Sequence, residues 1–220
     1  MVKTEVLTNE LNVLRSELRD LKSCQIQYVS LSVTGTGAII GFAATLASPS
    51  LRGIACLAPL VILLPCWWIF FDKATTITRL VGYVRVLETM ISGSPDFEYQ
   101  GYETALGLFR EREALYPPES PGGRLSTLYQ VLRLRTRHRF WTVNWYTFGS
   151  LSLVCWLLAF RFLEGTRVER FLALGVAAVL IIGSAFFTLR MVRDLIVGKY
   201  SYGHTTFVWN QLLRVDACKS

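Results

Sequence analysis

Charged side chains are scarce in this 220-residue sequence, and four long stretches contain none. Asp, Glu, Lys and Arg make up 18% of the residues and apolar types 52%, against roughly 25% and 45–50% in typical soluble domains. This composition excludes a disordered chain, a collagen and a small disulfide-stapled domain. The stretches that lack Asp, Glu, Lys, Arg and His are 28–47, 54–71, 143–160 and 171–189.

Recognisable catalytic and metal-binding patterns are also missing. The five cysteines form no CxxC pair, and His138 and His204 have no partner at a catalytic or metal-ligand spacing. There is no GxSxG, HExxH, P-loop or GxGxxG motif. We therefore expect no enzymatic activity, no metal and no cofactor. Proton-coupled transport is also not expected, because such transporters place ionisable residues inside their spans.

Each uncharged stretch is long enough to cross a bilayer. About 20 residues rising 1.5 Å each cover roughly 30 Å of hydrocarbon, and one charge at the centre would cost about 2.5–3.5 kcal/mol. The alternative is a soluble bundle, whose helices would carry a charged face that these stretches lack. The sequence therefore predicts an all-α protein with four transmembrane helices and cytoplasmic helical extensions.

The distribution of basic residues predicts the orientation of the chain. Nineteen of the 23 Lys and Arg residues lie before the first stretch, between the second and third, or after the fourth. The remaining four are Arg52, Arg161, Arg167 and Arg170. The positive-inside rule then places both termini in the cytoplasm and the protein in the plasma or inner membrane.

This orientation divides the chain into five predicted segments. They are a cytoplasmic amphipathic heptad helix (1–27), a first transmembrane hairpin (28–71), a cytoplasmic helical segment (72–142), a second transmembrane hairpin (143–189) and a cytoplasmic tail (190–220). The cytoplasmic helices are expected to continue the spans. The tail is expected to hold a further short helix near 207–215.

The densest basic run precedes the third stretch. It contains Arg133, Arg135, Arg137 and Arg139. Anionic lipids of the cytoplasmic leaflet attract such juxtamembrane clusters, so lipid contact is the first expectation and a nucleotide ligand the alternative. Direct nucleic-acid binding is not expected, because membrane topology already explains the net charge of +7.

A leucine seam runs through the N-terminal segment. Leu7, Leu11, Leu14, Leu18 and Leu21 are spaced 4, 3, 4 and 3 residues apart, which is the a/d pattern of a heptad repeat. The seam predicts either packing against another cytoplasmic helix of the same chain or self-association. No Pro or Gly occurs between residues 2 and 33, so the same helix is expected to enter the membrane.

The first span carries a stripe of small and hydroxyl residues. Ser30, Thr34, Gly37, Gly41 and Thr45 fall within about 80° of one another at 100° per residue. Such a stripe predicts either close helix packing, as in a GxxxG motif, or the lining of a hydrated pore. Pro59 and Pro65 lie in the second span. Their kinks suggest either gating hinges or static bends.

The two halves of the chain suggest a duplication. Residues 12–19 (NVLRSELR) match residues 130–137 (QVLRLRTR), and at the same offset of 118 Tyr28 falls on Tyr146. Both halves then read as helix, span, short loop, span and helix. This pattern is the hypothesis of a parallel repeat.

The layout of residues 5–92 resembles the SLATT family of small membrane effectors. The matching stretch runs from Ile69 to Glu88 (IFFDKATTITRLVGYVRVLE). That family consists of two-span proteins beside nucleotide-second-messenger systems of bacterial immunity, and its members are predicted to form pores. The leucine seam and the stripe of the first span both offer self-contacts, so we expect a homo-oligomer. With the resemblance, the leading expectation is a pore-forming or membrane-perturbing effector controlled through its cytoplasmic helices, with a cytosolic protein or a nucleotide as the trigger. The context of antiviral defence is implied by the resemblance alone. The alternative is a non-conducting membrane adaptor that docks a cytosolic partner through residues 94–123.

Overall fold

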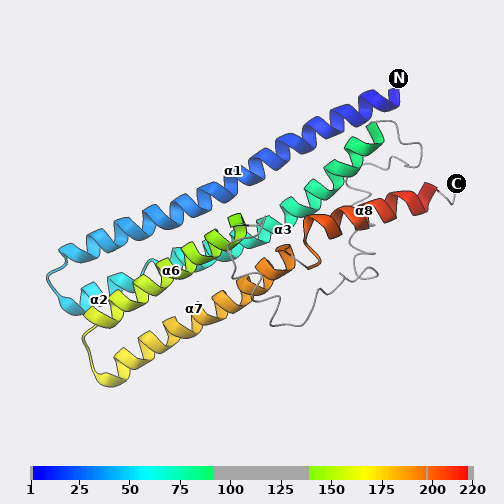
Figure 1. Cartoon of the computed structure of the whole chain (residues 1–220). Coiled ribbons are helices and arrows are strands. Elements are labelled where there is room, and N and C mark those ends of the chain that lie inside the picture. The colour runs from blue at the N-terminus through cyan, green and yellow to red at the C-terminus, as the bar shows by residue number, and fades with distance from the viewer. Residues whose placement is uncertain (1, 92–138, 197, 218–220) are drawn as a thin grey trace. The chain divides into compact units, whose positions relative to one another are not determined.

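The computed structural model describes residues 2–91, 139–196 and 198–217, which form helices joined by short turns (Figure 1). The helices are α1 (Val2–Thr45), α2 (Pro49–Leu57), α3 (Leu60–Ile91), α6 (Arg139–Phe162), α7 (Arg167–Ile196) and α8 (Tyr202–Ala217). No strand occurs in these ranges. Residues 94–123, like the basic residues Arg133, Arg135 and Arg137, lie outside the described part of the chain.

Four helical segments are long and apolar enough to cross a membrane: α1, α2 with α3, α6 and α7. The predicted fold class is therefore confirmed, and the chain is a multi-pass, all-α membrane protein. As expected, α1 runs without interruption through 44 residues, and α3 continues for 32 residues to Ile91.

The second span is interrupted at Pro59, one of the two prolines at which a kink was predicted. Helix α2 ends at Leu57, a turn follows at Ala58 and Pro59, and α3 begins at Leu60. Proline has no N–H, and its ring obstructs the carbonyl group four residues earlier, so α2 cannot continue through Pro59. Pro65 lies inside α3 without ending it.

The chain divides into two compact units, which we describe separately. The membrane unit comprises residues 24–72 and 130–192, and the extramembrane unit comprises residues 1–23, 73–129 and 193–220. Helices α1, α3 and α7 contribute residues to both units.

Aromatic rings fill the interior of the membrane unit. The Trp67 ring stacks on Phe148 with a centroid separation of 6.1 Å and meets Trp145 edge-on at 6.1 Å. Phe70 contacts both Phe148 and Trp141. Trp67, Phe70 and Phe148 are at most 1% exposed. Helices in lipid associate through such packing, because lipid tails are as apolar as the side chains.

The two hairpin turns of the membrane unit are closed in the same way. Arg52, the fourth residue of α2, donates from Nη2 to the carbonyl oxygen of Leu46 at 2.6 Å. Arg170, the fourth residue of α7, donates from Nη2 to the carbonyl oxygen of Phe160 at 2.6 Å. Each guanidinium therefore satisfies a carbonyl group at the end of the preceding helix. The two arginines are 118 residues apart, the offset at which the sequence halves match, but their acceptors, Leu46 and Phe160, are 114 residues apart. The duplication stays a prediction.

The extramembrane unit is built around a three-helix hydrophobic core. Leucines of α1 pack with residues of α3 and α8: Leu7, Leu11, Leu14, Leu80, Tyr83, Val84, Leu87, Val208, Trp209, Leu212 and Leu213. Leu18 and Leu21 pack against the edge of the same cluster. The leucine seam thus has partners within one chain, as the intrachain alternative predicts.

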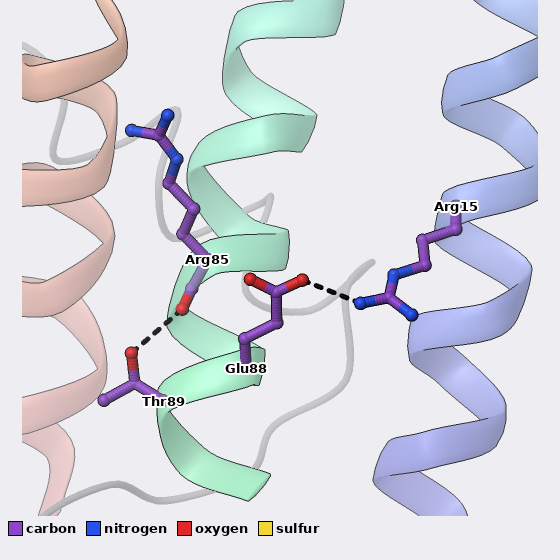
Figure 2. Close-up of polar contacts among 4 residues, drawn as sticks. All are labelled: Arg15, Arg85, Glu88 and Thr89. Atoms are coloured by element: carbon purple, nitrogen blue, oxygen red, sulfur yellow. Dashed lines mark hydrogen bonds and ion pairs between the residues drawn. The ribbon is translucent and has the colours of Figure 1, made fainter. Parts of the chain in front are cut away.

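Polar contacts join the same three helices. Trp209 Nε1 donates to the carbonyl oxygen of Arg79 at 3.1 Å, which fixes α8 against α3. Arg15 Nη2 pairs with Glu88 Oε1 at 2.9 Å, and Figure 2 shows this guanidinium reaching from α1 to α3. Both partners are about half exposed. Because solvent screens such pairs, the bridge adds at most about 1 kcal/mol.

Candidate functional site on helix α1

One face of α1 is buried inside the membrane unit. Gln25, Ser32, Thr36 and Ala43 are each at most 3% exposed. Their spacings of 7, 4 and 7 residues continue the heptad spacing of the N-terminal leucines. Gln25 Nε2 donates to the carbonyl oxygen of Phe70 at 2.9 Å, and Ser32 Oγ donates to that of Tyr28 at 2.7 Å. Gln25 was not among the predicted site residues. It follows Leu21 by four residues and so continues the spacing of the N-terminal leucines.

The predicted stripe lies on the opposite face. Ser30, Thr34, Gly37, Gly41 and Thr45 are all exposed. At 100° per residue they are centred about 160° around the helix from the buried face. A Cβ atom added at Gly37 or Gly41 would meet nothing within 4 Å. The structure therefore gathers the five residues on one surface that no other described part of the chain covers.

This surface differs from the exposed surface beside it. Leu31 and Phe42, on the adjacent face, are 53% and 63% exposed and present large apolar side chains. The stripe instead presents glycine backbone and hydroxyl groups, and Thr45 Oγ1 donates to the carbonyl oxygen of Phe42 at 2.8 Å. Bulky apolar side chains suit contact with lipid tails, whereas small residues let a second helix backbone approach.

Helix α1 also has the least burial of the four spans. In the most apolar 18 residues of α1 only 17% of the stretch is buried within the chain, whereas 44% is buried in the corresponding stretch of α2 and α3. The first span therefore has the most surface left for lipid or for another protein.

No family model, curated protein or solved structure matches this chain.

The predicted prolines and the described arginine of the basic run lie on other helices or turns than the stripe. Pro59 is buried at the turn between α2 and α3, and Pro65 is exposed on α3. Arg139 begins α6, but its side chain, like those of the other three arginines of the basic run, lies outside the description. Among the described residues no group of His, Cys, Asp and Glu could hold a metal ion.

Aromatic rings fill the space between α3 and α6 in the membrane unit, where Trp67, Phe70 and Phe148 are almost fully buried. Buried hydroxyl groups also occur in this unit, on Ser152, Ser184 and Thr188.

Proposed function

We propose that the protein is a self-associating membrane protein of the plasma or inner membrane, and that joined α1 stripes from several copies form a pore or membrane-perturbing assembly. One observation carries the proposal. One polar face of α1 is buried within the chain, while the opposite face is exposed. The exposed face carries Ser30, Thr34, Gly37, Gly41 and Thr45. A second copy of the same surface would cover it.

The chemistry of the stripe suits both association and a weakly selective path. Gly37 and Gly41 allow close backbone approach, and Ser30 and Thr34 supply hydroxyl groups that bond across helices or contact water. Weak selectivity is expected because the four stretches 28–47, 54–71, 143–160 and 171–189 contain no charged residue. In such an assembly the glycines would lie in the contact between α1 helices, and the hydroxyl groups would face the ion path.

Control is expected to come from the extramembrane helices. Helix α1 continues from the leucine cluster to the stripe, so a change in how Leu7, Leu11 and Leu14 pack would alter the same helix that associates in the membrane. A cytosolic ligand or partner would open the assembly only if it binds the open arrangement more tightly than the closed one. The proposed place in antiviral defence rests on the resemblance to SLATT effectors alone.

A flux assay tests the pore. The purified chain is reconstituted into liposomes, and the double variant Ser30→Leu/Thr34→Leu should abolish ion flux, because it replaces both hydroxyl groups with lipid-like side chains. Leu31→Phe, which adds apolar bulk beside the stripe, is the matched control and should conduct normally. Unchanged flux through a folded Ser30→Leu/Thr34→Leu protein would rule out the pore lining.

A non-conducting adaptor is the second candidate function. The ring cluster of the membrane unit favours it, because tightly packed rings such as Trp67, Phe70 and Phe148 obstruct a route between α3 and α6. The adaptor would hold a cytosolic partner through residues 94–123, and deleting this segment should abolish capture of that partner. Full retention of binding after the deletion would count against the adaptor.

A further inference from the structure

Two arginines share one aromatic ring at the end of the membrane unit where its hairpin turns lie. The guanidinium carbon of Arg52 lies 5.3 Å from the centre of the Phe162 ring, and that of Arg161 lies 5.9 Å from the same centre. The electron-rich ring attracts each cation without neutralising its charge. Phe162 is half-buried and packs against the cluster that includes Cys56 and Leu163. The ring is therefore a fixed support that keeps both cations in one place.

Direct contacts join the two hairpin turns at this end. Ser50 Oγ, from the start of α2, donates to the carbonyl oxygen of Glu164 at 2.8 Å. A Cβ atom added at Gly53 would collide with the backbone of Leu163. Figure 1 shows the turn between α1 and α2 and the turn between α6 and α7 at the same end of the membrane unit. The two arginines therefore belong to one corner of one compact unit.

Neither arginine is paired with a carboxylate of the described residues. Arg52 and Arg161 take part in no ion pair within that part of the chain. Of the two nearby acids, Glu169 accepts the N–H of Thr166 with Oε2 at 3.2 Å, and Glu164 is exposed and contacts Ser50 through its backbone. Two cations beside one ring repel each other. An anion that contacts both would remove this repulsion.

The helix ends at this corner also favour an anion beside Arg52. Arg52 is the fourth residue of α2, whose first turn contains no acidic residue and whose N-cap residue, Ser48, makes no side-chain capping bond. The first N–H groups of a helix have no partner within it, and the helix dipole attracts negative charge to that end. Arg161 lies in the last turn of α6, where the dipole favours a cation and helps to hold it.

The positions of both arginines along the chain place them at the boundary of the hydrocarbon. Arg52 comes two residues before the uncharged stretch 54–71, and Arg161 directly follows the uncharged stretch 143–160. Arginine side chains near the ends of spans extend to the level of the lipid headgroups. The arginines and both stretches belong to the membrane unit, so this placement follows from that unit alone.

We propose that Arg52 and Arg161, held on Phe162, bind the phosphate of an anionic phospholipid headgroup in the leaflet at the hairpin turns. Guanidinium groups bind phosphate oxygens through paired N–H donors. A lipid is favoured over a soluble phosphate because Leu51 and Ile54, beside Arg52, are 57% and 58% exposed and offer an apolar surface to acyl chains. The site lies within one chain, so it does not depend on the proposed self-association.

Native mass spectrometry of the full chain in detergent tests the site. Phosphatidylglycerol or phosphatidylcholine is added in steps, and the lipids bound per subunit are counted. The unmodified chain should retain phosphatidylglycerol in preference to phosphatidylcholine, whose choline would add a third cation. Arg161→Gln should weaken the retention of phosphatidylglycerol about fivefold, the effect of one juxtamembrane cation. Arg161 is exposed, so the fold should not change. Equal retention of the two lipids by the unmodified chain would overturn the site.

Two controls separate this site from general charge attraction and from a soluble ligand. Arg167→Gln removes another exposed arginine of the same turn, for which the described contacts include none with Phe162, and it should leave the retained lipid in place. An equal loss in Arg167→Gln and in Arg161→Gln would overturn the site. Displacement of the retained lipid by millimolar inorganic phosphate would overturn the lipid source and assign the two arginines to a soluble phosphate.

Discussion

Two glycines mark positions where helices meet so closely that a methyl group does not fit. A Cβ atom at Gly53 would lie 2.4 Å from Cα of Leu163, so the obstacle is backbone. At Gly82 the nearest atoms are side-chain atoms of Thr205 and Trp209 at 3.0 Å, which have more freedom to move. The first contact fixes α2 beside the end of α6, and the second fixes α8 on α3.

Substituting these glycines should therefore have graded effects on stability. Gly53→Ala is expected to cost about 1–3 kcal/mol, the usual range for overpacking, and Gly82→Ala less. Gly175→Ala is the control, because an added Cβ there meets nothing within 4 Å. Thermal unfolding in detergent measures all three, and a Gly53→Ala protein as stable as Gly175→Ala would contradict the close approach.

At the scale of single helices, spacing and composition predicted most of what the structure contains. The uncharged stretches predicted the four spans. The absence of Pro and Gly from residues 2 to 33 predicted that α1 is continuous. Kinks were predicted at both Pro59 and Pro65, but only Pro59 separates two helices, and the two prolines have the same local chemistry. Pro59 precedes the first residue of α3, where a missing N–H is harmless, whereas Pro65 is accommodated inside the helix.

The length of α8 was also underestimated from the sequence. The apolar pattern indicated a helix near 207–215, whereas α8 covers Tyr202–Ala217. The first turn of α8 is polar, so the apolar periodicity did not indicate a helix there. The helix begins after Ser201, whose side chain accepts the N–H of His204 and so acts as an N-cap.

Helix α1 also yields a prediction about association. Gly37→Leu/Gly41→Leu places two large side chains on the stripe and should prevent the close approach of α1 helices, shifting the protein toward monomer. Leu31→Phe adds bulk on the adjacent exposed face and should leave association intact. Crosslinking in native membranes compares the two variants. Equal crosslinking would show that copies do not meet through the stripe.

At the scale of the whole molecule, composition alone could not reveal which face of α1 is occupied. The residues 32 and 36 carry hydroxyl groups just as 30 and 34 do, so composition does not separate the two faces. The continued leucine spacing and the partners of the inner face, such as the Phe70 carbonyl group that accepts from Gln25, distinguish them. The outward direction of the predicted stripe is therefore the main information that the fold adds to the candidate site.

Self-association is the central claim, and the mass of the intact complex tests it most directly. The full chain is purified, placed in nanodiscs and weighed by native mass spectrometry. We predict a closed assembly of four or more subunits, since several α1 stripes must meet around an axis to enclose a path. A monomer at all protein concentrations would contradict the account, because a path lined by α1 stripes needs several copies of the chain.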